Sequence, residues 1–301
     1  MFTTVRSAAV NFVPWKWHKD WNADRLEMFF VEAAKHGAQL AVAPEGILEG
    51  YLVHEAFAWP QLREQMLGVA EPVNGPYMKR FAKLAKQLKC NLVFGFAELG
   101  GRTVYNTAAF IDARGQLRGT YRKMSNAIKD KYTWPFNGVG KTIRAFDTPL
   151  GRAGMLICSD RWYPQIPRTL VLDGAQFLCI LTYGSLSKKQ NRTVLARARE
   201  NGVPIVQANV GRNLIVSKGE IVAIDNARDT VTLADIDIPA RPSDAGRMAE
   251  QRRFLAAYPV KRARTSMYSS TAASKIRQTI GHDGRPPKPP RPNLRVRDHR
   301  G

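Results

Sequence analysis

The sequence has few of the residues that build metal centres and disulfide frameworks. It contains five histidines and three cysteines, and the cysteines stand far apart at Cys90, Cys158 and Cys179. Neither a C-x-x-C nor an H-x-x-x-H spacing occurs, so no metal site is predicted. Three cysteines cannot all pair, which indicates free thiols in a reducing compartment, and we expect a cytoplasmic protein.

Long apolar runs are also missing from the chain. A helix that spans a bilayer needs about 20 consecutive apolar residues, and the apolar runs here are far shorter. Residues 1–6 lead directly into a strand-like segment, without the charged region and long apolar stretch of a secretory signal. The sequence therefore predicts neither a membrane span nor a signal peptide.

Acidic residues are scarce, with 25 Asp and Glu against 46 Lys and Arg, which gives a formal net charge of +21. About half of this excess lies in residues 241–301, which hold fifteen Lys or Arg and four Asp or Glu. Such a balance favours contact with nucleic acid, anionic surfaces or acidic substrates. Because no nucleic-acid-binding motif accompanies the charge, we interpret it as a basic surface and expect no nucleic-acid partner.

What the chain does contain is an alternation of strand-like and helix-like segments. Amphipathic spacing predicts helices at residues 22–36, 75–89, 164–173 and 188–201. Apolar runs bounded by turn residues predict strands at residues 6–12, 40–43, 91–97, 107–111, 117–121, 142–146, 152–158, 177–182, 205–209, 214–217, 220–224 and 231–236. Interleaved strands and helices indicate an α/β fold, and hairpin turns at 112–115 and 148–151 indicate mixed sheets.

This pattern ends near Ser269. Residues 285–292 hold five prolines and three basic residues, a composition typical of an extended, exposed segment. We therefore predict one domain over residues 1–268 and a basic, proline-rich tail over residues 269–301. The tail is either mobile or wrapped over a surface, and an arm that docks on a second subunit is as plausible as a free tail.

Three reactive side chains stand where predicted strands end. Glu45 follows one strand, Lys123 follows another, and Cys158 is the last residue of a third. Ligands of α/β sheets gather beyond strand ends, so the three side chains are expected to converge. A carboxylate can take the proton of a thiol, and an ammonium can stabilise the thiolate and the oxyanion that follows. Each residue alone is more often structural, and the inference rests on their combination and order.

With these residues the chain resembles the nitrilase superfamily, the carbon–nitrogen hydrolases, over about residues 3–268. The glutamate, lysine and cysteine motifs of that family are seen in residues 43–46, 121–124 and 151–164. The resemblance implies a four-layer α-β-β-α sandwich of two mixed sheets, assembled as a homodimer or a larger homo-oligomer. It also implies a small-molecule substrate and no metal or organic cofactor.

The same resemblance assigns the roles of the site. Glu45 would be the general base, Cys158 the nucleophile, and Lys123 the group that stabilises the oxyanion, with the backbone N–H of Ser159 as the second donor. Many members of the family carry a second glutamate between the lysine and the cysteine. This chain has only Asp130 and Asp147 there, and Asp130 is the candidate that would replace it.

Substrate-binding residues are predicted close to the nucleophile. Arg161 resembles an arginine that carbamoyl-amino-acid hydrolases place against the substrate carboxylate, and a structural ion pair is the equally weighted alternative. Trp162 and Tyr51 are candidates for the pocket wall, although aromatic residues at such positions are as often part of the core.

The sequence thus predicts a thiol-dependent hydrolase that cleaves a small amide or an N-carbamoyl compound through a thioester. Two alternatives remain open at this stage. One is a nitrilase, which converts a nitrile to an acid. The other is a catalytically altered binding protein that keeps the sandwich and uses the basic tail to contact nucleic acid or an acidic partner.

Overall fold

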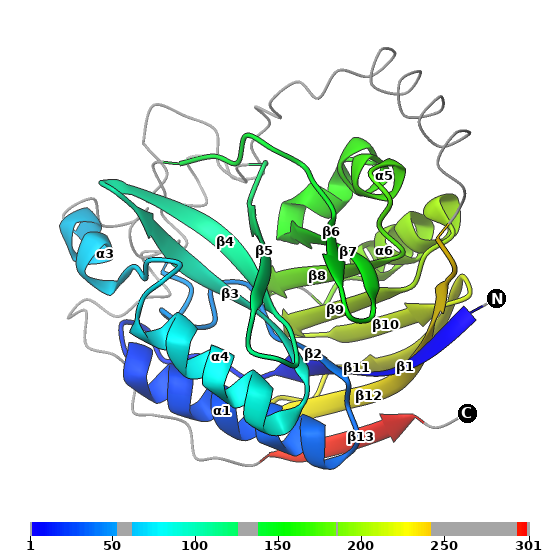
Figure 1. Ribbon diagram of the computed structural model, residues 1–301, viewed down its shortest axis with the longest axis horizontal. Coiled ribbons are helices and arrows are strands. Elements are labelled where there is room, and N and C mark those ends of the chain that lie inside the picture. Colours follow the sequence, from blue (N-terminus) through cyan, green and yellow to red (C-terminus); the bar gives the residue numbers. More distant parts are fainter. Residues whose placement is uncertain (1, 53–61, 126–137, 185, 242–293, 300–301) are drawn as a thin grey trace.

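The computed structural model describes residues 2–52, 62–125, 138–184, 186–241 and 294–299 (Figure 1). Within these ranges the chain forms two β-sheets with helices beside them. Most of the predicted strands and helices are present, with ends that differ by a few residues.

The larger sheet has seven strands in the order β13-β12-β1-β2-β3-β4-β5. These strands cover Phe2–Asn11 (β1), Leu40–Val42 (β2), Asn91–Gly100 (β3), Thr103–Ile111 (β4), Leu117–Arg122 (β5), Thr230–Pro239 (β12) and Arg295–His299 (β13). Strands β1, β2 and β3 are parallel neighbours, whereas β4 and β5 continue as antiparallel hairpins. The sheet is therefore mixed, as predicted.

The smaller sheet has six strands in the order β11-β10-β9-β8-β7-β6. They cover Phe146–Thr148 (β6), Gly151–Ile157 (β7), Phe177–Tyr183 (β8), Ile205–Val210 (β9), Asn213–Ser217 (β10) and Glu220–Asp225 (β11). Strands β7, β8 and β9 run parallel, and antiparallel strands flank them on both sides. This sheet is mixed as well.

Helices cover the outer face of each sheet (Figure 1). Helices α1 (Lys19–Lys35) and α4 (Pro76–Leu88) pack on the larger sheet, and α5 (Gln165–Leu172) and α6 (Lys188–Asn201) pack on the smaller one. A short helix, α3 (Arg63–Val69), precedes α4. The predicted four-layer α-β-β-α arrangement is confirmed. Within the described ranges, no helix combines the length and apolarity that a bilayer span requires.

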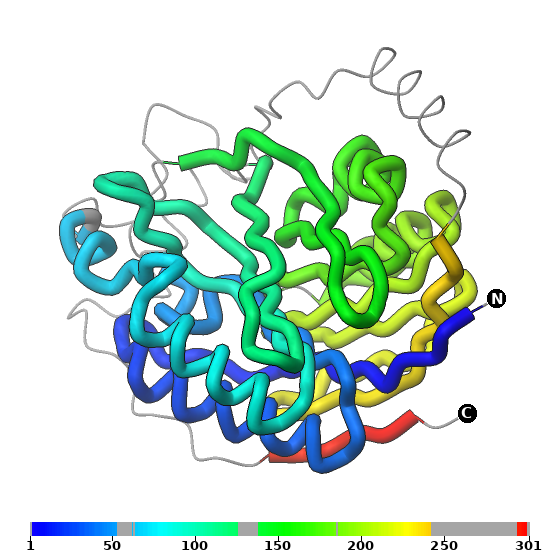
Figure 2. Tube along the Cα trace, viewed as in Figure 1, coloured from blue at the N-terminus to red at the C-terminus, as the bar shows by residue number. Residues whose placement is uncertain are grey.

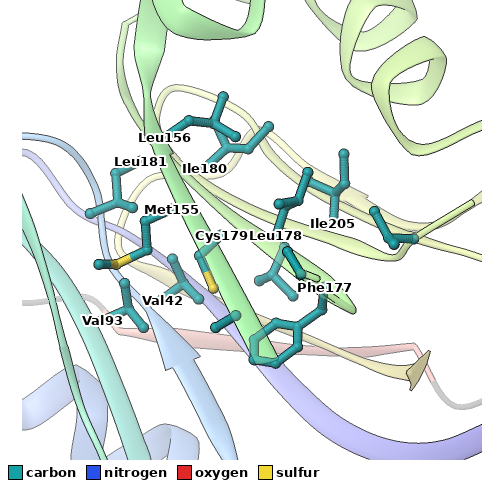
Figure 3. Packing of buried hydrophobic residues seen from close by; sticks show 14 of the residues in the cluster. Val42, Val93, Met155, Leu156, Phe177, Leu178, Cys179, Ile180, Leu181 and Ile205 are labelled. Carbon is teal, nitrogen blue, oxygen red and sulfur yellow. The ribbon is translucent and has the colours of Figure 1, made fainter. Parts of the chain in front are cut away.

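The core between the two sheets is built by alternation along the strands. Leu40 and Val42 of β2 face the smaller sheet, while Ala41 between them faces the helices of the larger sheet. Across the interface lie apolar residues of β7 and β8, such as Met155 and Cys179 (Figure 3). Because both faces of these strands are buried, their sequences are almost continuously apolar.

Two strands differ from the sequence-based prediction. The strand predicted over residues 142–146 is β6, which covers only Phe146–Thr148 and pairs with β7 through the predicted 148–151 turn. The strand predicted to end at Cys158 instead ends at Ile157, and Cys158 begins a 3-10 helix, η2 (Cys158–Trp162).

Strand β13 was not predicted, and it comes from the segment assigned to the tail. It pairs in parallel with β12 and forms an edge of the larger sheet (Figure 2). Arg6 of β1 forms an ion pair with Asp298 of β13, and the N–H of Arg295 donates to the carbonyl of Asp229. The last described residues are thus part of the sheet. The rest of the tail lies outside the described residues.

Phe110 tests the packing between the sheets. Its ring is fully buried against Phe146 and Phe177, with centroids 5.5 and 6.5 Å away. We expect Phe110→Ala to lower the free energy of unfolding by about 3–5 kcal/mol, measured by denaturant unfolding, because the cavity cannot close. Phe2, which is 56% exposed, is the matched control, and Phe2→Ala should change stability by less than about 0.5 kcal/mol. Equal losses in the two variants would contradict this packing.

Candidate active site

Glu45 lies in a turn that follows β2 and is hydrogen-bonded to the neighbouring strand β3. The N–H of Gly95 in β3 donates to the carbonyl of Pro44, and the N–H of Ile47 donates to the carbonyl of Gly95, both at 3.1 Å. A Cβ on Gly95 would lie 2.6 Å from the nitrogen of Gly46, so this close approach requires glycine. The N–H of Glu45 donates at 3.4 Å to the carbonyl of Thr182 in β8, which ties the turn to the smaller sheet.

Lys123 lies directly after β5 and forms a buried ion pair with Glu45. Its Nζ donates to Glu45 Oε1 at 2.7 Å, and both side chains are almost fully buried. Burial by itself lowers the pKa of Lys123. The charges of Glu45, Cys158 and Asp160 outweigh that effect and raise the pKa above its usual value, so the ammonium stays protonated.

Asn106 of β4 is a third member of this pair that sequence reasoning missed. Its Nδ2 donates to Glu45 Oε1 at 2.8 Å, and its backbone carbonyl accepts from the N–H of Lys123 at 2.8 Å. One residue therefore contacts both partners of the ion pair. The available signal was an amide side chain directly before the strand predicted over residues 107–111, since a buried amide needs hydrogen-bond partners.

Cys158 stands at the bend between β7 and η2. Its φ of 48° lies in the left-handed region, which a residue with a Cβ rarely adopts. The bend leaves Cys158 partly exposed, whereas Cys90 and Cys179 are buried. The structure thus brings the three strand-end side chains together, since Glu45 and Lys123 both act on the thiol.

The surroundings of the thiol favour its protonated form. Burial raises the pKa of Cys158, and the charge of Glu45 and a hydrogen bond with it raise this pKa further. Lys123 and Arg161 oppose the rise without overcoming it. At neutral pH the sulfur therefore carries a proton, next to a carboxylate able to accept it.

Asp160 connects the loop that follows Lys123 to the bend that carries Cys158. Its carboxylate accepts from the hydroxyl of Tyr121 and the N–H of Ser125, both at 2.8 Å, and from the N–H of Ile157 at 3.1 Å. Burial raises the pKa of Asp160, while Lys123 and these donors act against that rise. Sequence reasoning did not single out this aspartate, although it stands two residues after the cysteine.

Ser159 and Arg161 also form hydrogen bonds that fix the bend at Cys158. The hydroxyls of Ser159 and Ser125 are hydrogen-bonded at 2.7 Å, and Ser159 is buried. Arg161 donates to the carbonyl of Cys158 and, from its other terminal nitrogen, to Gln190 Oε1 of α6, both at 2.8 Å. Among the described residues these partners are neutral, and the alternative of an ion pair between Arg161 and a neighbouring acid is not seen there.

The two predicted aromatic residues occupy different surroundings. Trp162 has the cationic groups of Arg161 and Lys189 over its ring, at 5.2 and 5.5 Å from the centroid. Tyr51 is buried and stacks on Tyr183 at the end of β8, with ring centroids 3.9 Å apart. Asp130, the predicted replacement for the second glutamate, lies outside the described residues.

The donor set offers little to a metal ion. Among the residues that the structure describes, no group of three or more His, Cys, Asp or Glu side chains has the arrangement to bind one. The described site brings together a thiol, a carboxylate and an ammonium, a set that suits nucleophilic attack on an electrophilic carbon.

Known proteins resemble this chain in sequence. The sequence model of the carbon–nitrogen hydrolase family matches residues 6–241. The bifunctional nitrilase/nitrile hydratase NIT4B of Nicotiana tabacum is 31% identical over 215 residues, which cover 68% of this chain and 61% of that protein. Nitrilase 1 of Arabidopsis thaliana is 31% identical over 195 residues, or 62% of this chain and 56% of that protein. The chain thus spans about three fifths of the length of these relatives.

Solved structures resemble it in fold. The crystal structure of an amidase from Nesterenkonia sp. matches with a TM-score of 0.66 and 22% identity, covering 83% of this chain and 95% of the amidase. A variant of the amidase from Nesterenkonia sp. AN1 in complex with butyramide matches with a TM-score of 0.67 and 20% identity, over 85% and 97% of the two chains. At this identity the likeness concerns the fold alone.

Asp160 gives a test of how the bend is held. Asp160→Ala leaves the buried donors of Tyr121, Ser125 and Ile157 without an acceptor, and we expect a loss of at least about 3 kcal/mol in denaturant unfolding. Tyr121→Phe, the matched control, removes one of the three bonds and should cost about 1 kcal/mol. A loss in Asp160→Ala no larger than that of Tyr121→Phe would show that Asp160 does not hold the bend.

Proposed function

The chain belongs to the carbon–nitrogen hydrolase family, and from this membership we propose that it hydrolyses a small amide or N-carbamoyl compound with Cys158 as the nucleophile. One observation carries the proposal: the buried Lys123–Glu45 pair lies beside a partly exposed thiol. A site that only bound a ligand would have no need for these three groups, and burying two charges costs stability.

The proposed reaction begins when Glu45 takes the proton of the Cys158 thiol while the sulfur attacks the carbonyl carbon. The oxyanion that forms is stabilised by Lys123 and by the N–H of Ser159. As the carbon–nitrogen bond breaks, Glu45 returns its proton to the leaving ammonia or amine. Water then attacks the thioester, giving one proton to Glu45. The carbon–sulfur bond then breaks, Glu45 returns this proton to the sulfur, and the acid leaves.

The remaining predicted site residues have supporting roles in this proposal. The two hydrogen bonds of Arg161 support a role in orienting the bend that carries Cys158, and contact with a substrate carboxylate is the alternative. Trp162 and Tyr51 are proposed as pocket walls, and Asp130 as the group that positions water. The proposed partners are a small-molecule substrate and a second copy of the chain.

A nitrilase activity is the second candidate, and the sequence relatives favour it. Two of those most similar to this chain are named as nitrilases at 31% identity. Attack of the Cys158 sulfur on a nitrile carbon needs the same three groups and gives a thioimidate. One water adds to it and the nitrogen leaves as ammonia, and a second water hydrolyses the resulting thioester to the acid. The two candidates differ in whether the substrate is an amide or a nitrile.

A substrate screen tests both candidates. The purified protein is incubated with a panel of amides, N-carbamoyl amino acids and nitriles, and the release of ammonia is measured. We expect release from amides or N-carbamoyl compounds, and loss of at least about a thousandfold in Cys158→Ala because the nucleophile is gone. Cys90→Ala, which removes a buried thiol away from the site, should keep the activity. An undiminished rate in Cys158→Ala would remove this residue from the mechanism.

Arg161 is tested by comparing substrates with and without a carboxylate. If it orients the nucleophile, Arg161→Leu should lower kcat by on the order of tenfold for both kinds of substrate, because a small displacement of the sulfur is costly. Lys189→Leu is the control, since it removes a nearby cation that is exposed. A rise in KM limited to carboxylate-bearing substrates would instead assign Arg161 to substrate binding.

A further inference from the structure

A second carboxyl group is buried close to Glu45, and the proposed mechanism does not use it. Glu49 belongs to the same turn and is 1% exposed. Its Oε2 accepts from the N–H of Ala97 in β3 at 2.9 Å. Its Oε1 is buried and accepts no hydrogen bond from the described part of the chain. A buried carboxylate oxygen left in this state is costly, which calls for an explanation.

The carboxyl of Glu49 packs directly on the residue that follows Glu45. A Cβ on Gly46 would lie 2.7 Å from Glu49 Oε1, and Gly46 has a φ of +59° that favours glycine. Ala97, which binds Glu49, is the register partner of Asn106, which binds Glu45. Adjacent residues of two paired strands therefore hold the two carboxyl groups.

The charges around Glu49 differ from those around Glu45. Glu45 has a lysine in direct contact, whereas no lysine of the described ranges forms an ion pair with Glu49, and Lys19 of α1 acts on it only at longer range. Lys19 is itself paired at 3.0 Å with another buried carboxylate, Glu71. Glu45 is the other charge that acts on Glu49, and its effect is repulsive. Ala97, whose N–H binds Glu49, belongs to an apolar cluster that includes Tyr51.

We propose that Glu49 is a positioning residue for Glu45, and that the charge state of Glu49 controls the transfer of the proton from Cys158 to Glu45. This inference rests on the proposed function in taking Cys158 as the nucleophile and Glu45 as its base. The transfer moves negative charge from Glu45 to the sulfur. Glu45 and Glu49 repel each other, whereas the charges that act most strongly on the thiol are those of Glu45, Lys123 and Arg161. An ionised Glu49 therefore favours the transfer, and a protonated Glu49 does not.

The pH at which Glu49 changes its charge is set by its surroundings. Burial raises its pKa from 4.5 to about 7, with help from the charge of Glu45, against the hydrogen bonds of two backbone N–H groups and the charge of Lys19. The group is thus neutral below this pH and ionised above it. The reactivity of Cys158 should rise as pH increases through this value, beyond the rise that titration of the thiol itself produces.

The experiment measures the rate at which iodoacetamide alkylates Cys158, from about pH 5.5 to about pH 8.5. Glu49→Gln mimics the neutral carboxyl and keeps an oxygen for the N–H of Ala97. We expect equal rates in the two proteins at the acid end, and a wild-type rate roughly threefold higher at the alkaline end, with a midpoint near the pKa of about 7. Cys158→Ala supplies the background from Cys90 and Cys179.

Two further variants keep the test decisive. Lys19→Met removes the cation that lowers the pKa of Glu49, so the midpoint should move to higher pH. In a Glu45→Gln background, Glu49→Gln should have no effect, because Glu49 acts through Glu45. A rate ratio between wild type and Glu49→Gln that does not change with pH, or an unmoved midpoint in Lys19→Met, overturns the proposal. Alkylation needs no turnover, so a failure of the substrate screen is a separate result.

Discussion

The buried ion pair between Lys123 and Glu45 is the interaction on which the rest of the site depends. Two charges withdrawn from water are tolerated only when their geometry is good and their other hydrogen-bonding positions are filled. Asn106 donates a second hydrogen bond to the carboxylate of Glu45, and the backbone N–H of Glu45 holds the turn by donating to Thr182 in the other sheet. The ion pair and Asn106 come from the larger sheet, whereas Thr182 and Cys158 come from the smaller one. The sandwich is therefore the structural condition for placing an acid and an amine beside Cys158.

The bend at Cys158 is the second constraint, and it has its own cost. A left-handed φ at a residue with a Cβ costs roughly 1–3 kcal/mol and persists only when its surroundings fix it. Asp160 fixes it from the side of β5, and Arg161 fixes it from the side of α6. Without the bend the sulfur would continue along β7, whose side chains are buried in the core. The strain at one residue thus leaves Cys158 partly exposed.

The residues that could be predicted from the sequence are those whose position along the chain already implies their position in space. Glu45, Lys123 and Cys158 follow strands, and the ends of strands in such sheets meet. Asn106 could not be found in this way, because its contact with Glu45 depends on the register of β3 with β4 and on the turn above them. The strand at 295–299 could not be predicted from the sequence for a related reason. Its charged sequence has no apolar alternation, and its pairing depends on an open edge at β12.

The central claim is that Cys158 forms a covalent bond to the substrate carbon. The most direct test is mass spectrometry. The protein is mixed with an amide that it hydrolyses, and the reaction is quenched with acid before the thioester is consumed. The account predicts a mass increase of one acyl group, located on the peptide that contains Cys158. Two results would contradict it. One is an acyl group found on a residue other than Cys158. The other is release of ammonia without any acyl-protein, even in samples quenched from the start of the first turnover.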